Sequence, residues 1–178
     1  MIFSVRANEG ELEQHSEQEL STLGVLERQD IQEWAIEEPR LLGEDLLIIS
    51  SEYAGFEQTR DRLDILALDD EGKLVVAELK RDTADRTTDL QALKYASYSA
   101  TLTARDIQKE HRRFWSDRLN DPLTPEAVGD EFATFIGKHT DEEIPRSDDG
   151  WAEFELDNKP RIVLAAGQFG IEITSPVM

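Results

Sequence analysis

Three charged side chains, Asp64, Glu78 and Lys80, interrupt two apolar runs in the middle of the chain. A charge belongs in an apolar strand only where it has a partner or a chemical task, because burying an unpaired charge is costly. The runs RLDILAL and KLVVAELK flank an acidic turn that ends in Gly72, a pattern typical of a β-hairpin. Two carboxylates on one hairpin offer oxygen ligands, which favour Mg²⁺ or Mn²⁺.

The length of the turn decides whether these side chains meet. A three-residue loop with Gly72 in the left-handed conformation places Asp64 opposite Glu78, with Lys80 and Arg62 on the same face of the hairpin. A four-residue loop shifts the pairing by one residue and separates the acids. Opposed carboxylates repel each other, so the shorter loop predicts a divalent cation between them. A cross-strand cluster of salt bridges is the alternative interpretation.

The spacing of these residues also resembles a known signature. Asp64, a gap of thirteen residues and then Glu78-Leu79-Lys80 are similar to the D…ExK motif of the PD-(D/E)XK nuclease superfamily, which has the restriction-endonuclease-like fold. Leu63 stands where the superfamily carries the proline of its name, at a position that varies among its members.

A second motif follows on the next segment. Gln91 and Tyr95 resemble the Q-x-x-x-Y motif of the RecB-like branch of that superfamily. Residues 27–98 as a whole resemble the catalytic domain of the archaeal mismatch endonucleases, and nuclease-like domains at the start of longer chains. Two structural alternatives are open, since Thr88 with Gln91 fits a capping box and Tyr95 fits ordinary packing.

The resemblance implies a role for each residue of the signature. Asp64 and Glu78 would hold Mg²⁺ or Mn²⁺ against the scissile phosphate, with the Leu79 carbonyl as a further ligand. Lys80 would orient the attacking water and stabilise the charge that builds on the phosphate.

A fourth acid is expected from the first helix of such a domain. We choose Glu27 over Glu33 and Glu37, because Glu27 falls on the apolar stripe of that helix. The stripe comprises Ile31, Trp34 and Ala35. A favourable charge in the first helical turn is the alternative role of Glu27.

Several cations near the hairpin are candidates for contacts with substrate phosphates. Arg62, Arg81 and Arg86 flank the acids. The alternative for each is a solvated side chain that pairs with nearby carboxylates and has no contact with substrate. A further group combines cations with aromatic rings, which suits strand binding and is equally typical of an amphipathic helix. Its members are Lys109, Arg112, Arg113, Phe114 and Trp115.

These residues must be positioned by a sheet and its helices. Apolar patterns predict strands at 1–6, centred on 46–49, in the hairpin 62–82, and at 151–156, 161–167 and 168–174. They predict helices at 26–38, 86–102, 104–118 and 124–139, and an exposed helix or linker at 11–20. We therefore expect an α/β fold with a mixed central sheet flanked by helices, in a domain over 26–178 with its core at 27–118. Residues 1–25 are expected to form an N-terminal strand and an acidic helix or linker, and the chain is expected to be the N-terminal part of a longer protein.

Composition limits the possible partners. The chain of 178 residues has 39 acidic and 19 basic side chains and a net charge of −20. The segments 1–57 and 119–178 carry −11 and −9, whereas 58–118 is neutral, so weak affinity for DNA is expected but DNA is not excluded. High acidity with 6 Lys against 13 Arg is typical of halophilic proteins. The absence of Cys and the scattered His15, His111 and His139 disfavour zinc, and no apolar run of about 18 residues predicts a membrane span, so a cytoplasmic protein is expected.

Two functions follow as expectations. The first is a metal-dependent DNA endonuclease domain, with a homodimer as a further expectation. The second is a non-catalytic domain of the same fold that binds DNA or protein within a repair or defence protein. An acidic DNA mimic is a third option, and the neutral middle segment argues against it.

Overall fold

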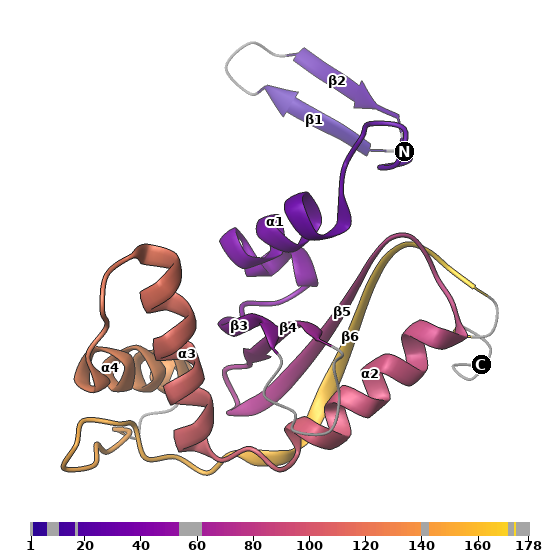
Figure 1. The fold of residues 1–178 in the computed structure, drawn as a ribbon. Helices are drawn as coiled ribbons and strands as arrows, with labels where there is room; N and C mark the ends of the chain where they lie inside the picture. The colour runs from indigo at the N-terminus through magenta and orange to yellow at the C-terminus, as the bar shows by residue number, and fades with distance from the viewer. Residues whose placement is uncertain are drawn as a thin grey trace.

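The computed structural model describes residues 2–6, 11–16, 18–53, 62–139, 143–170 and 173. A four-stranded sheet in the order β3-β4-β5-β6 forms the centre of the molecule (Figure 1). Its strands are β3 (Leu47–Tyr53), β4 (Leu63–Leu68), β5 (Lys73–Ala84) and β6 (Asp157–Phe169). The first three pair antiparallel and β6 runs parallel to β5, so the sheet is mixed. A separate antiparallel pair is formed by β1 (Ile2–Arg6) and β2 (Glu11–His15).

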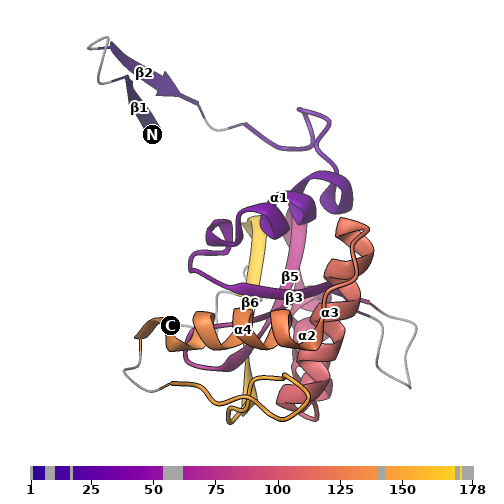
Figure 2. The same ribbon diagram turned by 90° about the vertical axis from the view of Figure 1, so that its left-hand side faces the viewer.

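Helices cover both faces of the four-stranded sheet. The short N-terminal turns are η1 (Glu27–Ile31), α1 (Gln32–Glu37) and η2 (Pro39–Leu42). The later helices are α2 (Arg86–Ser99), α3 (Ala104–Leu119), α4 (Pro125–Ile136) and η3 (Gly137–His139). Figure 1 and Figure 2 both place α1 above the strands and α2 below them. The expected α/β class with helices flanking a mixed sheet is confirmed.

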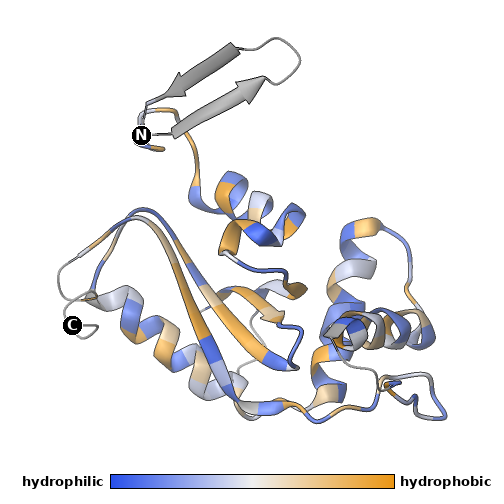
Figure 3. Ribbon diagram, turned by 180° about the vertical axis from the view of Figure 1, so that it is seen from behind, coloured by the Kyte–Doolittle hydropathy of each residue, from blue (hydrophilic) through white to orange (hydrophobic). Residues whose placement is uncertain are grey.

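Alternate residues of the strands supply two separate hydrophobic cores. Leu66 and Val76 pack with side chains of α2, α3 and α4 on one face. Ile65 and Ala77 pack with α1 on the other. Figure 3 shows the resulting nearly continuous apolar colour along the central strands. Because side chains alternate between faces, Glu78 falls on the same face as Val76 and therefore on the α2 side.

Two predicted elements were wrong. Residues 11–15 form β2, because pairing with β1 overrides the helical preference of the Glu- and Gln-rich stretch. Residues 153–156 are not a strand, and the predicted turn at 157–160 is the start of β6. Pro160 is tolerated there because β6 is an edge strand and its register against β5 shifts at that point.

The remaining predicted strand, 168–174, begins inside β6 and continues beyond the described residues. No helix in the described part of the chain is long and apolar enough to cross a bilayer.

Candidate active site

The hairpin turn has the geometry that the sequence predicts. The Asp69 N–H donates to the Lys73 carbonyl at 2.9 Å, and Gly72 has a φ of 79°. The Asp69 carboxylate also accepts from the Lys73 N–H at 2.8 Å, which closes the loop. The ladder above it pairs Ile65 with Ala77, so the three-residue loop is confirmed. One step further along this ladder come the two acids.

Asp64 and Glu78 are both buried carboxylates, with 8% and 3% of their surface exposed. Asp64 Oδ2 accepts from the Leu79 N–H at 2.9 Å, and Glu78 Oε1 accepts from Lys80 Nζ at 3.0 Å. Glu78 Oε2 is buried and has no hydrogen-bond partner among the described residues. An unsatisfied buried carboxylate oxygen is costly unless a proton or a cation completes it.

The environment shifts the pKa values of these groups. Burial raises the pKa of Asp64, against the opposing effects of the Leu79 N–H and the charge of Lys80. Burial, and then repulsion by Asp64, raises the pKa of Glu78 to about 7. Burial lowers the pKa of Lys80, but its hydrogen bond to Glu78 and the nearby carboxylates raise it overall. Without a further cation, the cluster therefore holds a proton more readily than free carboxylates do.

Glu27 reaches this cluster from the first turn of η1. Its Oε2 accepts from the Arg81 N–H at 2.9 Å, and its Oε1 lies 3.7 Å from Lys80 Nζ. The turn is a π-helix, in which the Gln32 N–H bonds to the Glu27 carbonyl, and the extra residue rotates the helix that follows. Consequently Trp34 is 43% exposed, and the predicted apolar stripe is wrong at that residue.

A bulge in β5 frees the backbone group that Glu27 binds. Lys80 pairs with Ala166 and Thr83 with Gln168, so two residues of β5 lie against the single Gly167 of β6. A Cβ at Gly167 would lie 2.8 Å from the Arg81 carbonyl oxygen, which explains why the close approach requires glycine.

Most of the candidate residues line one cavity of about 310 Å³. Its described lining consists of Glu27, Arg28, Arg62, Asp64, Glu78, Lys80, Gln91 and Tyr95. The last two come from α2, which begins with a capping box between Asp85 and Thr88. The alternative capping box of Thr88 with Gln91 is therefore wrong. Gln91 is exposed and Tyr95 is 1% exposed.

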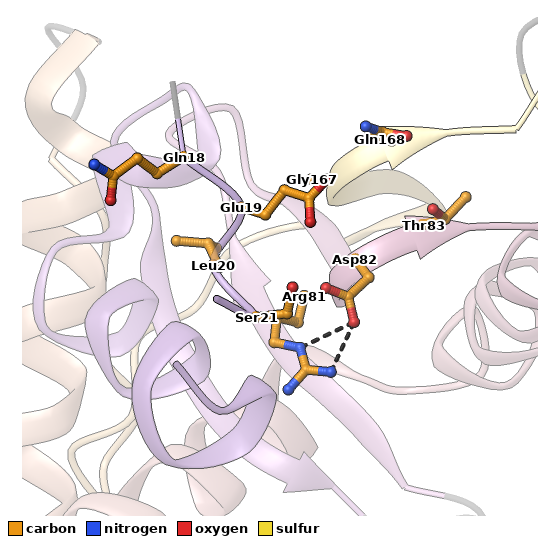
Figure 4. Close-up of a pocket in the computed structure, with 9 residues that line it drawn as sticks. All are labelled: Gln18, Glu19, Leu20, Ser21, Arg81, Asp82, Thr83, Gly167 and Gln168. Carbon is orange, nitrogen blue, oxygen red and sulfur yellow. Dashed lines mark hydrogen bonds and ion pairs between the residues drawn. The ribbon is translucent and has the colours of Figure 1, made fainter. Parts of the chain in front are cut away.

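The described lining of this cavity does not include Arg81 or Arg86. The guanidinium of Arg81 pairs with Asp82 at 2.7 Å and lies in a neighbouring cavity of about 590 Å³ (Figure 4). The side chain of Arg86 falls outside the described residues. The role of Arg81 as a substrate ligand remains a prediction, as does that of the Leu79 carbonyl.

The cluster of cations and aromatic rings on α3 has structural partners. Arg113 pairs with Glu110, and Arg112 donates to a backbone carbonyl at 2.6 Å. Phe114 and Trp115 pack against the core on the α1 side. Arg112, Phe114 and Trp115 thus have structural roles, which favours the interpretation as an amphipathic helix.

Sequence reasoning missed two residues at this site, Arg28 and Glu52. Glu52 lies on β3, one strand away from Asp64, and its carboxylate is 3.1 Å from Arg28 Nε and 3.7 Å from Arg62 Nη1. The only indication of Glu52 in the sequence is that a charged residue follows the apolar run of β3.

The oxygen donors of the cavity fit a metal ion that needs few protein ligands. Among the described residues, no group of three or more His, Asp or Glu side chains is arranged to hold one. Mg²⁺, however, is commonly held by one or two carboxylates and completes its shell with waters and substrate phosphates. Asp64 and the unpartnered Oε2 of Glu78 fit such a site.

One family model and one solved structure are similar to this chain. Residues 27–110, just under half of the chain, match the family model described as the endonuclease NucS C-terminal domain. The crystal structure of a repair endonuclease from Pyrococcus abyssi is 16% identical to the chain, with a TM-score of 0.39. That match covers 92% of this chain and 45% of the other, so the chain spans less than half the length of that enzyme. No curated protein matches the chain.

Proposed function

We propose that this chain is a metal-dependent DNA endonuclease domain of the PD-(D/E)XK type, which hydrolyses phosphodiester bonds with its D…ExK site. One observation carries the proposal: Glu27, Asp64, Glu78 and Lys80 line a single cavity, although they come from η1, β4 and β5. The similarity of residues 27–110 to an endonuclease domain supports it.

Each side chain has a defined task in this proposal. Asp64 and Glu78 bind one Mg²⁺ or Mn²⁺, which when bound supplies a Lewis acid and lowers the pKa of a bound water. Lys80 presents an ammonium 3.0 Å from Glu78 Oε1, where it donates to the attacking water and to oxygens that gain charge. Glu27 keeps this ammonium in the cavity through its carboxylate.

Further residues contact the metal or the substrate. The Leu79 carbonyl is proposed as an additional metal ligand. Gln91, Tyr95 and Arg62 contact the DNA backbone from the cavity wall, and Arg81 does so from the neighbouring cavity. A homodimer and a further C-terminal domain in the complete protein belong to the same proposal.

Cleavage of DNA by the purified chain tests the proposal. We expect it to nick plasmid, or to cut branched or single-stranded DNA, only with Mg²⁺ or Mn²⁺. Asp64→Ala and Lys80→Ala should each lower kcat by about 10²-fold or more. Asp45→Ala and Lys138→Ala are matched controls, because these residues form an exposed ion pair that does not line the cavity. Metal-dependent cleavage that survives both cavity substitutions would exclude this site.

A non-catalytic domain that binds DNA or protein is the second candidate. The observation in its favour is that no three His, Asp or Glu side chains among the described residues are arranged as a complete ligand set. Calorimetry with Mn²⁺ separates the two candidates. Absence of both Mn²⁺ binding and cleavage of any DNA form supports the non-catalytic domain.

A further inference from the structure

Glu52 has an unusual backbone conformation for a residue within a strand. Its φ is 51° inside β3. The other described non-glycine residue with a positive φ is Asn120, which ends helix α3 and so occupies a common site for this conformation. The left-handed region is strained for a residue with a Cβ, and such strain persists where the surroundings require it, often at functional sites.

The conformation of Glu52 turns its carboxylate toward two arginines. Oε1 is 3.1 Å from Arg28 Nε, and Oε2 is 3.7 Å from Arg62 Nη1. Both oxygens are shielded from solvent, and neither makes a hydrogen bond of good geometry within the described chain. Glu52 therefore holds two cations from separate elements, η1 and the start of β4, on one wall of the cavity.

Glu52 adds a further carboxylate beside a cavity whose described lining already includes Glu27, Asp64 and Glu78. Any anion that approaches also meets Glu27 and Glu78. The arginine pair is the part of the cavity wall in which positive charges outnumber negative ones.

Within the described part of the chain, both guanidinium groups keep donors available. A guanidinium carries five N–H donors in a planar fork that matches the oxygens of a phosphate. Glu52 is the only ion-pair partner of Arg28 and Arg62 within the described residues, and it faces one nitrogen of each. Their side chains remain 67% and 57% exposed.

We propose that Arg28 and Arg62, held by Glu52, form a second phosphate-binding subsite, which takes the phosphodiester next to the scissile one in the substrate strand. The inference rests on the proposed function for the identity of that strand. Arg28 and Arg62 bind the phosphate, and Glu52 is a positioning residue.

Steady-state cleavage of a fluorescent single-stranded oligonucleotide with Mn²⁺ tests the subsite. Arg28→Ala and Arg62→Ala should each raise KM about ten-fold and leave kcat within about two-fold, because a charge-assisted hydrogen bond to a bound group is lost. Arg40→Ala is the matched control, since Arg40 is 71% exposed, has one carboxylate partner and does not line the cavity.

Substitutions of Glu52 separate positioning from a purely structural role. Glu52→Gln keeps the shape but loses the ion pairs, so KM should rise as it does for the arginine variants. Glu52→Asp keeps the charge, and Asp tolerates a positive φ better than most residues, so it should restore a large part of the wild-type KM. Thermal unfolding of each variant identifies any that fail to fold, and Arg28→Ala, at an exposed side chain, then carries the test alone.

The outcomes distinguish this inference from the proposed function. If Lys80→Ala abolishes cleavage but Arg28→Ala and Arg62→Ala leave KM like that of Arg40→Ala, the subsite is wrong and the nuclease proposal stands. If the chain cleaves nothing, fluorescence anisotropy of the same oligonucleotide without metal replaces kinetics. About ten-fold weaker binding by the two arginine variants then supports the subsite, and unchanged or absent binding overturns it.

Discussion

Glu78 is the residue whose environment is least suited to its ordinary ionised form. It is almost fully buried, it lies opposite Asp64, and one of its oxygens has no hydrogen-bond partner in the described chain. Burial and the neighbouring carboxylate together raise its pKa to about 7. Lys80 neutralises only part of the charge of the two acids, so a proton or a further cation stabilises Glu78, and metal-free protein at high pH provides neither of these.

The pH dependence of stability tests this interpretation. Because the folded-state pKa of Glu78 lies above its unfolded value of 4.5, the unfolded chain loses this proton first. The free energy of unfolding of the metal-free protein should therefore fall as pH rises from about 4.5 to about 7. Glu78→Gln removes this contribution and should be more stable than wild type at pH 8, by on the order of 2–3 kcal/mol, but not at pH 5.

Urea unfolding in the presence of EDTA measures this difference. Saturating Mn²⁺ supplies the control, because it should stabilise wild type at pH 8 and have little effect on the variant. A difference between the two proteins that stays constant from pH 5 to pH 8 would contradict the raised pKa of Glu78.

At the scale of elements, the bulge at the end of β5 connects the sheet to η1. Without it the Arg81 N–H would belong to the ladder with β6 and would be unavailable to Glu27. Gly167 permits this arrangement, because its backbone lies directly against the carbonyl of Arg81.

Substitution of Gly167 should therefore affect both stability and the site. Gly167→Ala places a Cβ 2.8 Å from a backbone oxygen, so we expect a loss of about 1–3 kcal/mol in the free energy of unfolding. Cleavage should also slow, since Glu27 loses its backbone partner. Gly137→Ala is the matched control, because no atom lies within 4 Å of the added Cβ and φ is −69°. Equal stability and activity for both alanine variants would show that the bulge adapts freely.

Local patterns predicted the parts of the site that depend on local geometry. The turn at Gly72 sets the register of the hairpin, and this register places Asp64 opposite Glu78. Leu66 and Val76, which pair two residues further along, pack in one core. Such features depend on short stretches of chain, so the sequence carries them directly.

The other parts of the site depend on non-local structure. The parallel pairing of β6 with β5 joins residues far apart in sequence, and it makes a strand out of a segment that reads as a turn. Arg28 reaches the site from a π-helical turn, and Glu52 reaches it through a left-handed backbone conformation within a strand. Propensity predicts neither conformation, because tertiary contacts impose both.

At the scale of the whole molecule, the acidic charge is unevenly distributed along the sequence. The net charge of −20 is concentrated in residues 1–57 and 119–178, whereas the neutral segment 58–118 holds Asp64, Glu78 and Lys80. The neutral segment thus supplies three of the four proposed catalytic residues and segment 1–57 supplies Glu27, and the surrounding negative field opposes the approach of a nucleic acid. The same field acts on the folded state itself, because like charges are closer together in a compact chain.

Salt should therefore stabilise the protein. Raising KCl from 0.1 M to 1 M shortens the Debye length from about 10 Å to about 3 Å, and we expect the free energy of unfolding to rise by on the order of 1–2 kcal/mol. A combined variant, Glu153→Gln with Asp121→Asn and Glu155→Gln, removes three exposed charges that make no ion pair in the described chain. It should be more stable than wild type in 0.1 M KCl and respond less to added salt. Urea midpoints measured at both salt concentrations give the comparison, and a variant that keeps the full salt response would show that self-repulsion is not its cause.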